Sequence, residues 1–392
     1  MKPWKLLLVL LGLLFLFTRC SPQRNEQETL PFETKVEGTT TEAVTESIKE
    51  SEEETRSEES DTGILFYSFT KNFGGRTSKV FVLEMPKDSK EYMLLPVPAY
   101  NEVFGYRLLS EIIEKHHAEG GVNGGFSYAY GRHGGVLIQG TEFFNWKTDQ
   151  YPVLVYKDGQ YFFMESKDFS GHIEIKGQRM KIHGVNKPHE YVSNVIIYNP
   201  LYGKTDRLDQ EYFCVTVVED VIQKAEIVSG EKEIPNNGYL ITVGKPFDQD
   251  LLTSFFVPFE KVTLHFDPVL KEGDWAYECG DRLVEDGKNV APMFSGWVGT
   301  LESYDPRTAV GINASGNPVF VLVDGRQPGY SIGVTAKELS DIMIELGITE
   351  GALLDGGANS EMIINGEIVN RPSFKGQERP MATAFVIVKK KG

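Results

Sequence analysis

Apolar residues follow strand-like patterns through most of the chain beyond residue 64. Residues 79–85 form an apolar run bounded by a proline and a charged turn, which predicts a strand. Residues 150–270 are dense in similar short runs, such as 151–156 and 194–198, separated by turn sequences. This region is therefore expected to fold mainly into short strands.

Two segments have the spacing of amphipathic helices instead. Residues 107–118 place four apolar side chains on one face and stop before two glycines. The second helix is predicted to start at Thr335, where Glu338 completes a capping box, and to end at Gly347. Its apolar stripe consists of Leu339, Ile342, Met343 and Leu346.

The last ninety residues add strands around the second helix. Residues 308–312 and 319–323 are predicted to be adjacent strands, and 352–354 to be a buried strand. Two more strands are expected within 360–365 and 383–388. Because no linker composition occurs after residue 63, we expect residues 63–392 to form a single α+β domain, with a mixed β-sheet core and flanking helices.

The N-terminal twenty residues have the features of an export signal. Two lysines precede an apolar run from Leu6 to Phe17, which is shorter than the ~20 residues that span a bilayer. Cys20 follows and resembles the lipidated first residue of mature bacterial lipoproteins, although Arg19 stands where these have a small residue. We therefore expect lipidation at Cys20 and membrane anchoring, with a plain cleaved signal or an uncut anchor as alternatives.

Residues 21–62 are rich in Glu, Thr and Ser and are expected to be a disordered acidic linker. Residues 22–61 carry 13 acidic and 4 basic side chains, and the whole chain has a formal charge of −16. Neither this segment nor the remainder has the basic character that nucleic-acid binding requires. A nucleic-acid partner is thus excluded.

Two cysteines remain if Cys20 is the lipid site. Cys214 and Cys279 would lie in a compartment where disulfides persist. Sequence gives no geometry for them, so a disulfide and two buried free thiols are both open.

Four polar clusters lie beside glycines at predicted strand ends, at residues 121–126, 305–308, 323–326 and 354–360. Glycines let the backbone approach a ligand closely and can turn N–H groups toward an anion. Each cluster alone would be typical of a turn.

In this order the clusters resemble the phosphodiester glycosidase family. The family's Asn-Gly-Gly-Phe, Arg-Thr-Ala-x-Gly and Asp-Gly-Arg segments are similar to residues 123–126, 307–311 and 324–326. Its Asp-Gly-Gly-Gly-Ser turn reads Asp-Gly-Gly-Ala-Asn-Ser at 355–360, and Ser127 replaces a second Phe. The resemblance spans about residues 64 to 389 and implies an exported hydrolase of sugar-1-phosphodiesters, such as N-acetylglucosamine-1-phosphodiester, in a cell-surface glycopolymer.

The chemistry of such a substrate suggests roles for the cluster residues. The group that leaves the anomeric carbon is a phosphate monoester, a weak base that needs little protonation. The site then needs a carboxylate that activates water or attacks the anomeric carbon, and cations that bind the departing phosphate. We assign the carboxylates to Asp324 and Asp355, and the phosphate contacts to Arg307 and Arg326. Asn123, Asn359 and Ser360 are assigned to bind sugar hydroxyls. Backbone N–H groups are expected from Gly124, Gly125, Gly356 and Gly357.

Other interpretations of the same residues stay open. No cofactor is required, but Asp324, Asp355 and Asn359 have the oxygen ligands that Ca²⁺ or Mg²⁺ prefers. A metal-dependent phosphodiesterase that cuts P–O is therefore one alternative, and a non-catalytic glycan-binding lipoprotein is another. In a purely structural interpretation, Asp324 and Arg326 form an ion pair and Asp355 belongs to a turn.

Overall fold

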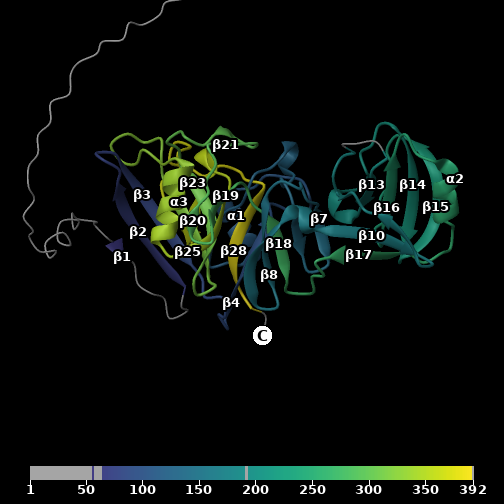
Figure 1. Ribbon diagram of the computed structural model, residues 1–392, viewed down its shortest axis with the longest axis horizontal. Helices are drawn as coiled ribbons and strands as arrows, with labels where there is room; N and C mark the ends of the chain where they lie inside the picture. Colours follow the sequence, from purple (N-terminus) through teal and green to yellow (C-terminus); the bar gives the residue numbers. More distant parts are fainter. Residues whose placement is uncertain (1–54, 57–63, 190–192, 391–392) are drawn as a thin grey trace, which may run out of the picture. The chain divides into compact units, whose positions relative to one another are not determined.

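A sheet of eight antiparallel strands forms the part of the fold that carries most of the predicted site. The computed structural model describes residues 55–56, 64–189 and 193–390 (Figure 1). In spatial order the strands are β1 (Thr55–Arg56), β2 (Leu65–Asn72), β3 (Thr77–Glu84), β24 (Pro318–Val323), β23 (Arg307–Asn313), β25 (Ile348–Leu353), β19 (Arg282–Glu285) and β20 (Lys288–Asn289).

The second sheet packs against the first and supplies the other side of the site. It runs in the order β27 (Glu367–Ile368), β26 (Met362–Ile364), β5 (Gly120–Asn123), β28 (Thr383–Lys389) and β4 (Tyr92–Pro98). Side chains along β28 alternate between two cores. Phe385 and Ile387 join the core shared with the first sheet, whereas Ala384 and Val386 pack under α1 (Leu109–His116).

The same alternation explains the continuous apolar run in β24. Phe320 and Leu322 face the core between the sheets, and Val319, Val321 and Val323 face α3 (Ala336–Glu345). A strand that is buried on both faces has no polar face in its sequence.

Three further sheets are formed mainly by the middle of the chain. One contains β7 (Glu142–Asn145), β6 (Leu137–Gln139), β18 (Trp275–Glu278), β8 (Pro152–Lys157) and β9 (Gln160–Glu165). Another contains β12 (Gly184–Val185), β13 (Val195–Tyr198), β16 (Gly238–Gly244), β14 (Glu211–Val218) and β15 (Val221–Ser229), with α2 (Gln249–Phe255) nearby in sequence. The third contains β11 (Gln178–Lys181), β10 (Ser170–Ile175) and β17 (Thr263–Asp267), and β21 (Phe294–Ser295) pairs with β22 (Gly299–Thr300).

The helix signals in the sequence are confirmed. The Thr335 hydroxyl accepts from the Glu338 N–H (3.1 Å), and the Glu338 carboxylate accepts from the Thr335 N–H (2.9 Å). Gly347, at φ +79°, follows the end of α3. None of the helices in the described ranges combines the length and apolar character needed to cross a bilayer.

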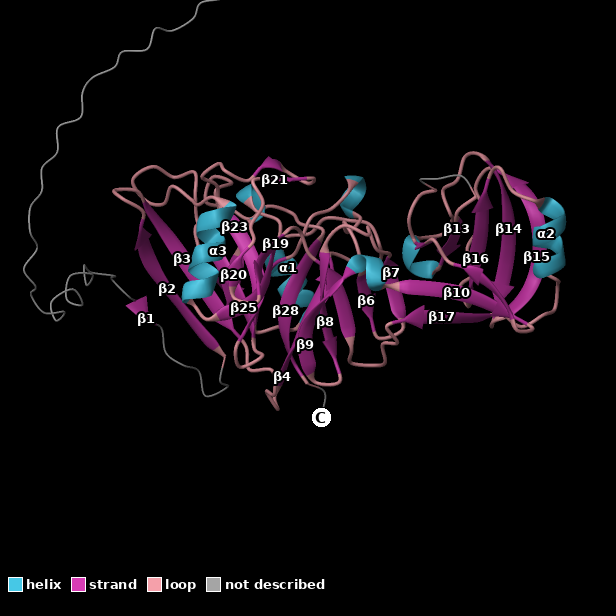
Figure 2. Ribbon diagram, in the orientation of Figure 1, coloured by secondary structure: helices cyan, strands magenta, loops and turns pink. Residues whose placement is uncertain are grey.

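Strands predominate in the described residues, as Figure 2 shows, and three α-helices accompany them. The expected α+β class is therefore only roughly right, and the fold is better described as several β-sheets with few helices. The difference arises because residues 150–270 add many strands and only one α-helix. The predicted strands in 79–85, 308–312, 319–323 and 383–388 are all present.

The predicted N-terminal features lie almost entirely outside the described residues. These are the export signal with Cys20 and the acidic linker, apart from β1, which pairs antiparallel with β2. The boundaries at residues 20 and 62 stay predictions.

A buried carboxyl group lies at the end of β18. The Glu278 carboxylate accepts from the N–H groups of Val136 (2.9 Å) and Thr148 (3.2 Å) and is almost without solvent contact. Burial raises the pKa of Glu278 to about 7, against the smaller opposite effect of these hydrogen bonds.

We predict that Glu278 makes the protein less stable as the pH rises. Because the pKa of Glu278 is higher in the folded than in the unfolded state, the folded state binds the proton more tightly. The stability that this proton contributes is lost as the pH rises from the unfolded-state pKa to about 7. The slope should approach ~1.4 kcal/mol per pH unit. The free energy of unfolding in urea should differ less between pH 5 and pH 8 for Glu278→Gln than for the wild type. Equal differences in the two proteins would contradict the raised pKa of Glu278.

Candidate active site

The two main sheets are joined where β5 and β25 end. The backbone N–H of Asp355 donates to the carbonyl of Gly124 (3.1 Å), and the side-chain amide of Asn123 donates to the carbonyl of Asp355 (2.8 Å). These bonds connect the loop after β25 to the loop after β5. Segments far apart in sequence, around residues 123 and 355, are thereby held together.

A pocket of about 190 Å³ opens beside this junction. It contains three of the four residues predicted to carry the chemistry, namely Arg307, Arg326 and Asp355. The remaining lining residues are Phe126, Val298, Thr300, Ser303, Asp305, Pro306, Leu353, Leu354, Gly356 and Gly357. The pocket therefore combines two carboxylates, of Asp305 and Asp355, with two guanidinium groups.

Asp355 is a half-buried carboxylate held by its own loop. Its Oδ1 accepts from the N–H of Gly356 (2.9 Å), and its Oδ2 accepts from the side-chain amide of Asn359. Burial raises the pKa of Asp355, and these two donors oppose the rise. A carboxylate in such surroundings is a better proton acceptor than one in water.

Arg326 lies at the mouth of the pocket in a left-handed conformation, at φ +60°. Its Nε donates to Oδ1 of Asp305 (2.8 Å), and half of the side chain is exposed. The guanidinium lies over Gly357, where a Cβ atom would be 3.1 Å from Nη1. A glycine at this position gives the guanidinium room beside the Asp355 loop.

Asp305 is a pocket residue that the sequence analysis quoted in a cluster but did not assign. Burial raises the pKa of its carboxyl, but the Ser303 hydroxyl and the Arg326 guanidinium outweigh that effect and hold the pKa below its usual value. The Asp-Pro-Arg sequence at the start of β23 could have indicated Asp305 as a site residue, since it places an acid two residues before Arg307, a predicted phosphate ligand.

Arg307 is buried and is held by backbone carbonyls. Its Nε donates to Val334 (3.0 Å), and its Nη2 donates to Ser303 (3.1 Å) and Leu301 (3.3 Å). Oδ2 of Asp305 lies 4.0 Å from its Nη2. Burial lowers the pKa of Arg307, yet an arginine stays protonated at neutral pH. Arg307 thus contributes positive charge to the pocket and fixes the loops that surround it.

Asp324 does not line the pocket. Its side chain is buried and accepts from the Asn370 amide (2.8 Å), the Arg371 N–H (2.8 Å) and the Tyr330 hydroxyl (3.0 Å). Burial raises the pKa of Asp324, and these three donors oppose the rise. The carboxylate therefore anchors the 370–371 segment to the end of β24, and Arg326 pairs with Asp305 instead of Asp324.

The glycine N–H groups predicted to face the substrate all donate within the protein. Gly124 donates to the Thr383 carbonyl (2.9 Å) and Gly125 to the Tyr277 hydroxyl. Gly356 donates to Asp355, and Gly357 donates to the Pro306 carbonyl (2.8 Å). These glycines instead allow close packing, because a Cβ on Gly124 would be 2.2 Å from Thr383 Oγ1.

The three predicted ligands for sugar hydroxyls differ in their availability. Asn123 uses its amide fully, because it also donates to the Gly124 carbonyl (3.0 Å) and accepts from Thr308 Oγ1 (2.9 Å) and the Glu361 N–H (3.2 Å). Asn359 Oδ1 and Ser360 Oγ, in contrast, are buried without a hydrogen-bond partner among the described residues. Asn123 is thus a positioning residue.

An aromatic wall, formed by Phe126, Trp297 and Tyr128, reaches the pocket through Phe126. The Phe126 and Trp297 rings stack at 5.5 Å with an interplanar angle of 7°, and Tyr128 lies 5.0 Å from Trp297. Gly280 leaves room for this wall, since a Cβ there would be 2.5 Å from Phe126. Trp297 lies in a loop without any motif, so it had not been predicted as a site residue.

The remaining candidates fall outside the pocket. Cys214 and Cys279 are both buried free thiols, which decides between the two states left open. In the described part of the chain, the group of three metal-ligand side chains within 4.8 Å of one another is His172, Glu174 and His265, without either predicted aspartate.

The loops of this β-rich fold thus bring two carboxylates and two guanidinium groups into one pocket. Residues 214–388 match the model of the phosphodiester glycosidase family. The matched residues contain Arg307, Arg326 and Asp355. The resemblance drawn from the motifs is confirmed over this range.

The chain also resembles individual proteins. It is 31% identical over 112 residues to the SPbeta prophage-derived uncharacterized protein YomE of Bacillus subtilis (strain 168), a match that covers 29% of this chain and 17% of YomE. A hypothetical protein from Synechocystis superposes with a TM-score of 0.70 at 18% identity, over 83% of this chain and 62% of that protein.

A Burkholderia pseudomallei K96243 protein, whose name describes it as exported, superposes with a TM-score of 0.64 at 20% identity. This superposition covers 80% of this chain and 74% of that protein. At such identities the two superpositions show a shared fold alone.

Proposed function

We propose that this protein is a hydrolase that cleaves the bond between the anomeric carbon of a sugar and a phosphate group. The observation that carries this proposal is the shared pocket of Asp355 and Arg326 within the part of the chain that matches the phosphodiester glycosidase family. The substrate class is a sugar-1-phosphodiester, such as N-acetylglucosamine-1-phosphodiester, in a cell-surface glycopolymer.

The reaction requires one carboxylate and little acid catalysis. Asp355 takes a proton from water as the water oxygen bonds to the anomeric carbon, or it attacks that carbon itself and is later released by water. The bond from the anomeric carbon to the phosphate oxygen breaks, and its electron pair leaves with the phosphate monoester. Because this leaving group is a weak base, a strong general acid is unnecessary.

The phosphate would be bound by Arg326. Its Nε is engaged by Asp305, so the Nη groups over Gly357 are left to face the pocket. Arg307 supports them with a buried positive charge beneath the same loop, in an otherwise acidic protein. The two carboxylate oxygens of Asp305 accept from Arg326 and from the Ser303 hydroxyl, so Asp355 is the pocket carboxylate available for the sugar.

The sugar would lie against the aromatic wall. Aromatic faces bind the apolar C–H faces of sugar rings, and Phe126 presents such a surface to the pocket. The unpartnered oxygens of Asn359 and Ser360 are additional acceptors for hydroxyl groups once the loop 357–360 adjusts.

We also propose that the protein acts outside the cytoplasm, anchored through lipid on Cys20. The short apolar run after two lysines supports this location. The mass of the N-terminal peptide from membrane fractions tests the anchor: an acylated Cys20 would support it, and an unmodified N-terminus would refute it.

Replacement of Asp355 by Asn should abolish turnover and leave the thermal midpoint nearly unchanged. The Asn oxygen can still accept from Gly356, and its amide can donate to Asn359 Oδ1, which has no partner now. Release of sugar from a sugar-1-phosphodiester, resolved by mass, measures the activity. Asp286→Asn, at an exposed site outside the pocket, serves as the control and should keep wild-type turnover.

Labelled water separates this hydrolysis from cleavage of the P–O bond by a phosphodiesterase. Oxygen-18 should enter the sugar product, and its appearance in the phosphate product would overturn the proposed bond cleavage. Binding of a panel of sugar phosphodiesters without any product would instead favour the glycan-binding alternative.

Replacement of Arg326 by Ala should reduce kcat/KM by about 10- to 100-fold, because a charge-assisted contact to phosphate is lost. Arg326→Lys should be intermediate, since a lysine retains the charge and loses the paired donors. Arg179 is a matched control, because its Nε also donates to a carboxylate, Glu174 (2.9 Å), outside the pocket. Equal kcat/KM for Arg326→Ala and Arg179→Ala would argue against a phosphate contact.

A further inference from the structure

Strands β10 and β17 bring two histidines and a glutamate onto one face of a small sheet. His172 pairs directly with His265 across the two strands, and Glu174 follows His172 by two residues, on the same face. The alternate residues Ile173, Leu264 and Phe266 face the apolar core. This arrangement gives three metal-binding side chains a common direction.

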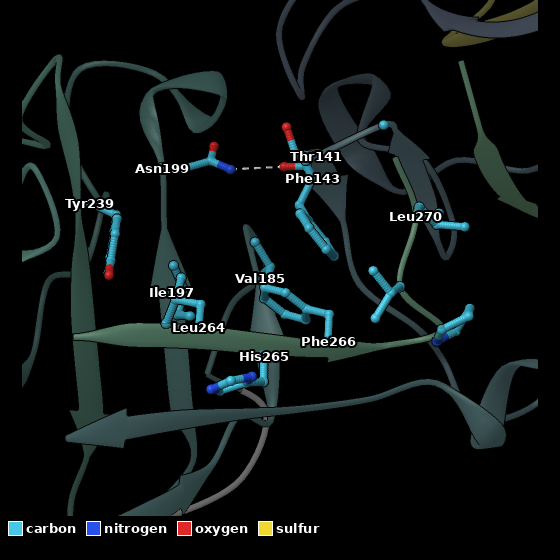
Figure 3. Close-up of a pocket in the computed structure, with 13 residues that line it drawn as sticks. Thr141, Phe143, Val185, Ile197, Asn199, Tyr239, Leu264, His265, Phe266 and Leu270 are labelled. Carbon is cyan, nitrogen blue, oxygen red and sulfur yellow. Dashed lines mark hydrogen bonds between the residues drawn. The ribbon is translucent and has the colours of Figure 1, made fainter. Parts of the chain in front are cut away.

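A cavity of about 500 Å³ lies beside the same strands, and His265 is among the residues that line it. Figure 3 shows the ring of His265 on the side of β17 opposite to the ring of Phe266, which lines the cavity. The cluster therefore borders the cavity through His265, and it shares no residue with the pocket of Asp355.

The potential ligand atoms of the cluster lie close together, and two of its nitrogen atoms lack a hydrogen-bond partner among the described residues. One potential ligand atom from each of the three residues lies within 4.8 Å of the others, and His265 Nε2 is 3.8 Å from Glu174 Oε2. The two imidazole rings stack at 4.6 Å with an angle of 11°. Nε2 of His172 and Nε2 of His265 are both buried and without a hydrogen-bond partner among the described residues. Buried polar atoms in folded proteins normally have partners.

We propose that His172, Glu174 and His265 bind a divalent transition-metal ion of the Zn²⁺ type. Two imidazoles and one carboxylate suit zinc, whereas Ca²⁺ and Mg²⁺ prefer oxygen ligands alone. Ligands at ~2.0–2.1 Å in a tetrahedral site are roughly 3.3 Å apart, so small side-chain rotations close the present separations. Water completes the coordination.

Arg179 is the competing partner of Glu174. Its Nε donates to Glu174 Oε2 (2.9 Å), but two thirds of the Arg179 side chain is exposed. An exposed ion pair of this kind contributes little to stability, far less than a metal bond. Zinc can therefore displace this arginine from the carboxylate.

The site would join the two strands that enter and leave the segment 176–262. That segment contains the five strands of the β12–β16 region, and β10 and β17 pair at its two ends. A metal bond between these strands closes a long loop and should stabilise the folded state. This role is independent of the proposed hydrolysis.

Titration of the chelator-treated full chain with ZnCl₂, followed by calorimetry, tests the proposal. One Zn²⁺ should bind per chain, and zinc should raise the thermal midpoint. His172→Ala and His265→Ala should each weaken binding by at least tenfold and remove the shift in the midpoint. Glu174→Gln should weaken binding as well, with little change in side-chain volume.

His117→Asn is the matched control, because His117 is an exposed histidine at φ +49°, a conformation that asparagine tolerates. It should bind zinc as the wild type does. The visible spectrum of a Co²⁺ complex reports tetrahedral coordination, and it should vanish in His265→Ala. Absence of stoichiometric binding by the wild type, or unchanged binding by both alanine variants, would overturn the proposal.

Discussion

One buried side chain, the amide of Asn123, determines where the carboxylate of the pocket lies. It donates to the carbonyl groups of Gly124 and Asp355 and accepts from Thr308 and Glu361. These partners come from both main sheets, and each bond lies in the interior, where an unpaired polar group is costly. The amide therefore fixes the loop after β25 relative to β5, and no other uncharged side chain has two donors and an oxygen acceptor at this reach.

The pocket depends on arginines in two different environments. Arg307 is surrounded by carbonyl oxygens, which stabilise its charge without cancelling it, whereas Arg326 has a direct ionic partner in Asp305. The first is rigid and buried, and the second is half-exposed. An anionic ligand would thus contact the half-exposed guanidinium of Arg326, with the buried charge of Arg307 nearby. The prearranged buried charge limits the reorganisation required on binding.

Local sequence rules predicted the elements that depend on local interactions. The capping box at Thr335 and Glu338 and the short apolar strands β23 and β24 follow from propensity and spacing, so the sequence was sufficient for them. The class of the fold was less accessible, because the pairing of residues 150–270 into separate sheets depends on contacts between distant segments. Short apolar runs do not specify their partners.

The candidate site also has features that are visible in the sequence and features that depend on contacts between distant segments. Arg307, Arg326 and Asp355 could be named because polar residues beside glycines at strand ends are visible in sequence. The difference between Asp324 and Asp355 could not be predicted, since both follow an apolar strand and precede a glycine. Only the three-dimensional structure shows that Asn370, Arg371 and Tyr330 donate hydrogen bonds to Asp324, whereas Asp355 borders the pocket. Trp297 had no sequence signal, because its role arises from stacking on Phe126.

The departure from the family's Asp-Gly-Gly-Gly-Ser turn also has a physical explanation. Asn359 lies within the altered part of the turn, and its amide donates to Oδ2 of Asp355. A donor at this position favours the ionised carboxylate and limits the rise in pKa that burial causes. The change therefore adds a contact to the proposed base and leaves the carboxylate in the pocket. Its effect should fall on the strength of the base and on the shape of the sugar site, since Asn359 Oδ1 and Ser360 Oγ lie in the same turn.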